Sequence, residues 1–173
     1  MRLRTERLVL RPVAEGDLDS LLAIRNAPEA VGTTSTGAPL PRERMEGQLG
    51  RRLESWREHG LGSWLVLLDA EPIGYVEVAP IGEDSGVPPD EIELGVVIHP
   101  DHWGRGFAGE AGLAVAADCF ERVGLERVYA GVDPENERSL RALAKTPGVR
   151  RVDGELYELT AAALAAVSRS AVR

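Results

Sequence analysis

The fold prediction for this chain begins with the stretch HPDHWGRGFAGEAGLAVAADCF, residues 99–120, where three glycines within six residues run straight into an alanine-rich segment. Apolar residues at 108, 111, 115, 119 and 123 predict a core-facing helix over 107–123. A helix N-terminus carries unpaired N–H groups and a partial positive charge, and both favour an anion such as phosphate. Gly104 and Gly106 lack side chains that would keep a phosphate away. The loop is therefore either a phosphate cradle or a plain strand-to-helix connection.

Two common phosphate-binding motifs are excluded by the residues around this loop. No Gly-Lys-Ser/Thr follows the glycines, so the loop is not a P-loop. The spacing also departs from the glycine fingerprint of dinucleotide-binding folds, because no acidic residue closes a following strand about twenty positions on.

Strand and helix patterns alternate over the rest of the chain. Strands are predicted at 6–13, 63–68, 73–79, 91–98, 127–132 and 155–160, and helices at 14–26, 45–56, 107–123, 139–145 and in the alanine-rich C-terminal segment. The turn residues DAEP make the second and third strands a hairpin, and Pro80–Glu91 is predicted to be a loop. This order predicts an α/β fold with a mixed central sheet of about seven strands and flanking helices.

Composition limits the classes of function. The net charge of −8 argues against a nucleic-acid partner and is compatible either with a cationic substrate or with a simple solubilising surface. The single cysteine, Cys119, excludes an internal disulfide and fits the reducing cytoplasm. No apolar run approaches the roughly 18 residues of a membrane span, and the first residues lack a signal-peptide core. The length of 173 residues predicts one domain over 1–173.

The segment IELGVVIHPDHWGRGFAGEA, residues 92–111, resembles the acetyl-CoA-binding signature of the GNAT acetyltransferases: a strand, a Q/R-x-x-G-x-G/A loop and a helix. Residues 4–26, 132–145 and 154–160 are similar to further segments of the Rim-type enzymes, which acetylate ribosomal-protein N-termini. The resemblance covers about 3–160. It implies a GNAT fold with splayed central strands, acetyl-CoA as co-substrate, and transfer of acetyl to a primary amine of a protein N-terminus or a small molecule. It also makes a homodimer possible.

The resemblance assigns cofactor-binding roles to particular residues. The backbone of Val96, Val97 and Ile98 would pair with the pantetheine arm as if the arm were another strand. The residues implied to hold the pyrophosphate are Gly104, Arg105, Gly106, Phe107, Ala108 and Gly109, and Asn136 would also bind the cofactor. Gly95, inside a strand, suggests the β-bulge that splays the central strands in this family.

The chemistry requires a base for the ammonium and a proton donor for the departing thiolate. Glu93 shares a strand face with Gly95 and occupies the place of a candidate base in Rim-type relatives, with Glu91 as the second candidate. A solvated strand carboxylate is the alternative interpretation of Glu93. The resemblance makes Ser139 the donor to the thiolate, and a helix N-cap is its alternative role.

The chain departs from the family pattern in three places, and the last two favour the alternative function, a non-catalytic acetyl-CoA-binding sensor or interaction module. Trp103 replaces the first Gln or Arg of the signature, which removes one side-chain phosphate contact. Leu143 stands where many GNAT enzymes have a tyrosine acid, and KTPGVRR, residues 145–151, replaces the usual Gly-Phe.

The remaining candidates have simpler interpretations. His99 and His102 have no third ligand nearby, so no metal is expected. Cys119 is interpreted as a core residue, and Trp56 and Trp64 as core or loop-anchor residues, with the lining of an acceptor pocket as their alternative role. The loop 31–44 is expected to set the identity of the acceptor amine.

Overall fold

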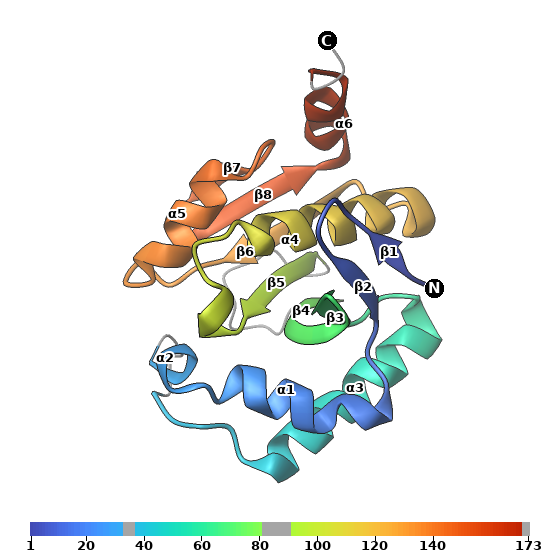
Figure 1. Cartoon of the computed structure of the whole chain (residues 1–173). Helices are drawn as coiled ribbons and strands as arrows, with labels where there is room; N and C mark the ends of the chain where they lie inside the picture. Colours follow the sequence, from blue (N-terminus) through green and yellow to red (C-terminus); the bar gives the residue numbers. More distant parts are fainter. Residues whose placement is uncertain (33–36, 81–90, 171–173) are drawn as a thin grey trace.

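A mixed sheet with the strand order β1-β2-β3-β4-β5-β6-β8-β7 runs through the middle of the molecule (Figure 1). The computed structural model describes residues 1–32, 37–80 and 91–170, so the interior of the predicted Pro80–Glu91 loop and part of the predicted acceptor loop lie outside the described residues. The strands are β1 (Leu3–Arg4), β2 (Val9–Pro12), β3 (Trp64–Leu68), β4 (Glu71–Pro80), β5 (Ile92–Ile98), β6 (Arg127–Gly131), β7 (Arg150–Asp153) and β8 (Leu156–Thr160). The predicted α/β class is confirmed, and the described residues add two short edge strands, β1 and β7, that no pattern had indicated.

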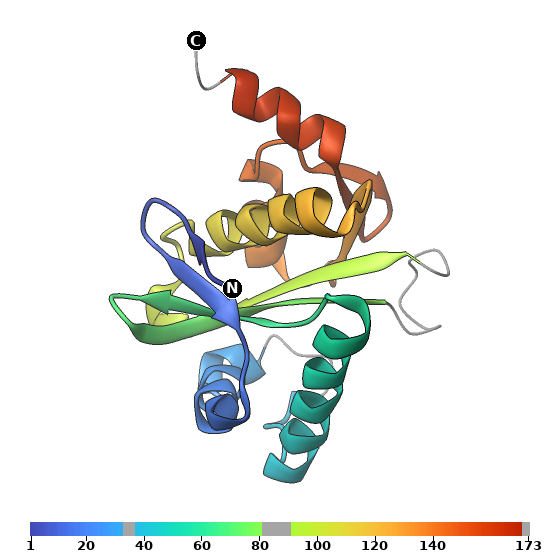
Figure 2. The same cartoon turned by 90° about the vertical axis from the view of Figure 1, so that its right-hand side faces the viewer.

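Helices cover both faces of this sheet (Figure 2). One face carries α1 (Leu18–Arg25), α2 (Pro28–Val31) and α3 (Arg42–His59), and the other carries α4 (Phe107–Asp118), α5 (Glu137–Lys145) and α6 (Ala161–Ser170). Two short 3₁₀ helices are η1 (Glu15–Asp17) and η2 (Pro100–His102), and η3 (Cys119–Val123) is a π-helical segment that continues α4. No helix among the described residues has both the length and the apolar character needed to cross a membrane.

The alternating pattern of β5 is confirmed by its packing. Leu94 and Val96 face α4, where a Cβ on Gly112 would lie 3.4 Å from Val96 Cγ2 and 3.6 Å from Leu94 Cδ2. Val97 points the other way and packs with Tyr75 against the α1 and α3 side chains. Because successive strand residues alternate between faces, Glu93 and Gly95 also point toward the α1 and α3 side.

Other sequence interpretations are confirmed in the core and in the turns. Trp64 is fully buried and its ring meets Trp56 edge-on at 5.1 Å. Cys119 is buried against α4 neighbours, and burial raises the pKa of its thiol to about 12, which leaves it inert. The β3–β4 hairpin turns at Asp69 and Ala70, both with positive φ, as two-residue hairpin loops require.

The sheet separates between its two parallel strands. β5 and β6 share a single register pair, Glu93 with Tyr129, whereas β4 pairs with β5 without interruption from Gly74–Ile98 to Pro80–Ile92. The β-bulge predicted at Gly95 is therefore wrong, and the strands part without it. A Cβ on Gly95 would meet nothing within 4 Å, so this glycine leaves open space above the sheet.

Candidate active site

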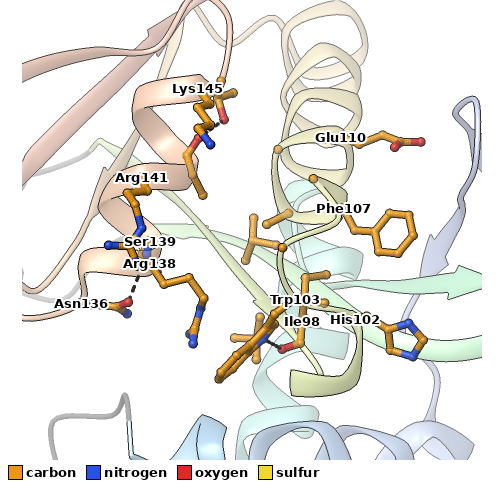
Figure 3. Close-up of a pocket in the computed structure, with 18 of the residues that line it drawn as sticks. Ile98, His102, Trp103, Phe107, Glu110, Asn136, Arg138, Ser139, Arg141 and Lys145 are labelled. Carbon is orange, nitrogen blue, oxygen red and sulfur yellow. Dashed lines mark hydrogen bonds between the residues drawn. The ribbon is translucent and has the colours of Figure 1, made fainter.

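A cavity of about 700 Å³ lies where the sheet opens, between β5, the loop before α4, and α5 (Figure 3). It extends to the opposite side of the sheet, where Arg25 of α1 and Ala30 of α2 line it. The predicted site residues that line it are Val96, Val97, Ile98, Gly104, Gly106, Phe107, Ala108, Gly109, Asn136 and Ser139. Arg105, Glu91 and Glu93 do not belong to this lining, although Arg105 lies between two lining glycines and Glu93 lies on β5 itself.

The loop before α4 takes the shape that a bound anion would need. Gly104 and Gly106 have φ of 74° and 82°, a left-handed conformation that favours glycine. Gly106 is the N-cap of α4, and no side chain caps the helix there. The N–H groups of the first turn are therefore available to a ligand in the cavity.

An arginine from the N-terminal segment fixes this loop from outside. Arg7 Nη1 donates to the carbonyl oxygen of Arg105 at 2.9 Å, and Arg7 Nε donates to Glu110 Oε2 at 2.7 Å. The guanidinium groups of Arg7 and Arg105 lie 4.5 Å and 4.6 Å from the centroid of the buried Phe107 ring. Phe107 and Glu110 point away from the cavity (Figure 3), so these side chains support the loop while its backbone faces the cavity.

The edge of β5 offers main-chain groups where the sheet opens. His99 N–H donates to Ile73 O at 2.8 Å, and antiparallel pairs alternate between hydrogen-bonded and non-bonded positions. Val97 therefore bonds toward Tyr75 on β4, while Val96 and Ile98 turn their main-chain groups toward the opening. Trp103 Nε1–H already occupies the Ile98 carbonyl at 2.6 Å. Val96 and the N–H of Ile98 form the edge to which an extended amide chain can add.

Helix α5 forms the opposite wall of the cavity, and Asn136 begins it. Asn136 Oδ1 accepts a hydrogen bond from the N–H of Ser139 at 3.1 Å, which makes Asn136 the N-cap. The alternative role of Ser139 as the N-cap is therefore wrong. Its hydroxyl is not needed for the cap, and Ser139 lines the cavity.

Three cations of α5, which the sequence reasoning missed, line the same wall: Arg138, Arg141 and Lys145. The guanidinium of Arg138 lies 3.2 Å from the centroid of the Trp103 ring across the cavity. Burial, with the neighbouring charge of Arg141, lowers the pKa of Arg138. The helical spacing of these cations was visible in the sequence, but the same spacing is typical of a solvated helix face.

Glu93 lies where β5 and β6 begin to separate. Its Oε1 accepts a hydrogen bond from the N–H of Gly131 at 3.4 Å. Burial raises the pKa of Glu93, the charge of Glu77 adds to the rise, and the Gly131 hydrogen bond opposes it. A carboxylate with a raised pKa is a stronger base.

Glu77 is a second carboxylate on this side of the sheet, which the sequence reasoning did not identify. It lies opposite Gly95 in the β4–β5 register. Arg52, only 6% exposed, holds both Glu77 oxygens at 3.0 Å and 2.9 Å. Because Arg52 balances the charge of Glu77, the carboxylate that suits a cationic amine beside the open space of Gly95 is that of Glu93.

The segment that departs from the family pattern contributes to the wall and to the sheet edge. Lys145, Thr146 and Pro147 line the cavity, and a Cβ on Gly109 would lie 3.0 Å from Thr146 Oγ1. Leu143 does not line it, and no tyrosine does within the described residues. Those residues also contain no group of three or more His, Cys, Asp or Glu that could hold a metal ion.

Known proteins resemble this chain in both sequence and fold. A family model described as an acetyltransferase (GNAT) domain matches residues 7–146. An uncharacterised N-acetyltransferase of Bacillus licheniformis is 30% identical over 145 residues, which cover 82% of this chain and 78% of that protein. A crystal structure of an acetyltransferase from Agrobacterium tumefaciens is 28% identical, with a TM-score of 0.73 over 91% of this chain and 93% of the other.

An aminoglycoside acetyltransferase, AAC(6')-Ib, solved with ribostamycin and coenzyme A, superposes with a TM-score of 0.77 over 92% of this chain and 97% of the other. Another structure of that enzyme contains acetyl-CoA. The sequence identity is 18%, so this likeness is one of fold.

Proposed function

Because this chain belongs to the GNAT family of acetyltransferases, we propose that its cavity binds acetyl-CoA and that its acceptor is a primary amine of a small molecule or a protein N-terminus. The observation that carries the proposal is one continuous cavity joining an uncapped helix N-terminus, a free strand edge and a cationic wall. Its named relatives are N-acetyltransferases, which supports an enzyme of that class over the alternative of a non-catalytic acetyl-CoA-binding sensor.

The residues present fit the charged part of acetyl-CoA. The first turn of α4 offers N–H groups to the pyrophosphate, and Arg138, Arg141 and Lys145 offer positive charge. Trp103 replaces the Gln or Arg of the family signature, but the guanidinium of Arg138 on α5 stacks on the Trp103 ring and brings a cation to that position. The α5 arginine thus replaces a contact that the sequence alone marked as lost.

The proton transfers fall to Glu93 and Ser139. Acetyl-CoA supplies an activated acetyl group as a thioester. Glu93 takes a proton from the acceptor ammonium, directly or through a water molecule, so that the amine nitrogen can bond to the acyl carbon. Ser139 donates a hydrogen bond to the sulfur as the C–S bond breaks. The nitrogen loses its second proton to solvent as the amide forms, and the thiolate takes up a proton from solvent.

The test of this function is acetyl transfer with defined amines. Purified protein is mixed with acetyl-CoA and a panel of amines that includes N-terminal peptides, amino sugars, polyamines and amino acids. Thiol release and the mass of the product are then measured. We expect at least one amine to gain an acetyl group at its nitrogen. Tight acetyl-CoA binding with no transfer to any amine would overturn the proposed activity.

Gly106→Val is expected to weaken acetyl-CoA binding about 30-fold, equivalent to about 2 kcal/mol. A branched side chain disfavours the φ of 82° at which Gly106 presents the α4 N–H groups, and its Cβ would lie 3.5 Å from Nη2 of Arg7, the side chain that holds the loop. Isothermal titration calorimetry measures the change. The control is Gly124→Val: Gly124 has the same φ of 82° but lies past the far end of α4. Equal affinities in both folded variants would exclude the phosphate cradle.

Arg138→Met is expected to weaken acetyl-CoA binding about tenfold and to reduce the salt dependence of binding, because one charge-assisted contact is lost. Arg122→Met is the matched control, because Arg122 also stacks on a tryptophan but lies outside the cavity. Its guanidinium is 5.5 Å from the centroid of the Trp56 ring. An equal loss of acetyl-CoA affinity in Arg122→Met would mean that the change in net charge, and not a lost contact with the cofactor, weakens binding.

Four expectations from the sequence stay predictions: the cytoplasmic location, the single domain over 1–173, the homodimer and the Rim-type relationship.

A further inference from the structure

Among the described residues, the arginines that are buried or half-buried have carboxylate partners, with two exceptions. Arg11 pairs with Asp17 at 2.7 Å, Arg52 with Glu77 at 2.9 Å and Arg127 with Glu158 at 3.4 Å. Arg25 and Arg138 are half-buried and have no carboxylate partner among the described residues, and both line the large cavity. A partly desolvated charge without a partner is unfavourable, so a ligand is the expected partner of each.

The two unpaired arginines lie on different sides of the sheet. Arg138, on α5, faces the cofactor side described above. Arg25 is in the last turn of α1, on the other face, and lines the cavity together with Ala30 and Val97. Its Nη1 is buried and has no hydrogen-bond partner in the described part of the chain, so the other nitrogens of its guanidinium are the ones that can meet a ligand in the cavity.

Arg25 lies at one end of the strand face that carries the proposed base. Val97, which also lines the cavity, shares that face with Gly95 and Glu93. Tyr75 pairs with Val97 in the sheet, and the charge of Arg25 reaches its phenol, opposing the rise in the Tyr75 pKa that burial causes. At about 3.3 Å per residue, Val97 and Glu93 are roughly 13 Å apart along the strand, with the open space of Gly95 between them.

We propose that the acceptor amine also carries a carboxylate, which Arg25 binds while the ammonium lies toward Glu93. This inference rests on the proposed function, since it names the class of acceptor that the same site takes. The charges on this face are complementary to such a molecule: the carboxylate of Glu93 lies toward the amine, and the guanidinium of Arg25 lies at the other end. Guanidinium and carboxylate form paired, charge-assisted hydrogen bonds, which make Arg25 a specificity-determining residue.

The experiment compares amino acids with the amines that remain when the carboxylate is removed. The pairs are alanine with ethylamine, γ-aminobutyrate with propylamine, and ε-aminohexanoate with pentylamine. Binding to the protein saturated with coenzyme A is measured by calorimetry, and kcat/KM is measured with acetyl-CoA. We expect the acid of at least one pair to bind about tenfold or more tightly than its amine, and the favoured pair to report the amine-to-carboxylate spacing.

Substitution of Arg25 identifies the residue responsible. In Arg25→Met the two members of the favoured pair are expected to bind equally, whereas Arg25→Lys should keep part of the preference. Arg44→Met is the control, because Arg44 is an exposed arginine of α3 in the same helical layer and its loss changes net charge equally. Affinity for acetyl-CoA is measured in every variant and is expected to stay unchanged.

Three results would overturn the proposal. The first is a wild-type protein that binds no acid more tightly than its amine, and the second is an acid preference that survives Arg25→Met. The third is a loss of acetyl-CoA affinity in Arg25→Met as large as that in Arg138→Met, which would assign Arg25 to the cofactor. Failure of the proposed function gives a different result, an acid preference in binding without thiol release from acetyl-CoA.

Discussion

Glu93→Gln is expected to lower turnover by about 10²–10⁴ and to leave acetyl-CoA affinity unchanged. The amide cannot accept the proton of the acceptor ammonium, yet its oxygen can still accept the hydrogen bond from the N–H of Gly131. The deficit should shrink at high pH, where free amine becomes plentiful. Steady-state kinetics over a pH range, with calorimetry of acetyl-CoA binding, provides the measurement.

The raised pKa of Glu93 makes the same variant informative about stability. A carboxyl with a higher pKa in the folded than in the unfolded protein favours folding below its unfolded pKa, and this contribution is lost as pH rises through the folded pKa. At neutral pH the ionised Glu93 therefore disfavours the folded state. Glu93→Gln should be at least as stable as the wild type there, so slow turnover cannot be attributed to unfolding.

The matched control for Glu93→Gln is Glu91→Gln. Glu91 immediately precedes β5 and was the second candidate for the base. We expect Glu91→Gln to keep its turnover within a factor of about three, an ordinary effect for a change away from the reacting groups. If Glu91→Gln is slow and Glu93→Gln is not, Glu91 is the base. If neither variant is slow, water takes the proton.

Ser139→Ala is expected to lower turnover about 10- to 100-fold, with the KM for acetyl-CoA changed only a few-fold. A serine hydroxyl is a weak acid, so its contribution is a hydrogen bond that strengthens as the sulfur gains charge. Leu143 offers no hydroxyl, and Ser139 lines the cavity. Rates and melting temperature are measured on one preparation.

Asn136→Ala distinguishes this role from a structural one. Asn136 caps α5, so its replacement should cost about 1 kcal/mol of stability, whereas Ser139→Ala should leave the melting temperature unchanged. A Ser139→Ala protein that melts lower and turns over at the wild-type rate would contradict the proposed role.

The sequence by itself predicted six of the eight strands of the described residues and the two faces of β5. The period-2 pattern of β5 and the 3.6-residue pattern of α4 were sufficient to place Leu94 and Val96 against the helix and Glu93 on the opposite side. The glycines before α4 were also informative, because the left-handed conformation at Gly104 and Gly106 is a local property of the backbone. Local signals of this kind depend only on neighbours along the chain.

Only the tertiary structure decided which distant residues share the cavity. Glu77 lies opposite Gly95 because of the β4–β5 register, and the connecting residues 81–90 give no rule that fixes this register from the sequence. The predicted bulge failed for the same reason, since the separation of β5 from β6 depends on pairing between strands far apart in the chain.

The capping of α5 and the unpaired arginines also required the structure. Asn136 and Ser139 are both good N-cap residue types, and the helix start alone distinguishes them. Arg25 ends a helix, where arginine is common, and Arg138 lies on a helix that could have been solvated. Whether an arginine has a carboxylate partner depends on three-dimensional packing between elements, and a single sequence does not encode that packing in any local pattern.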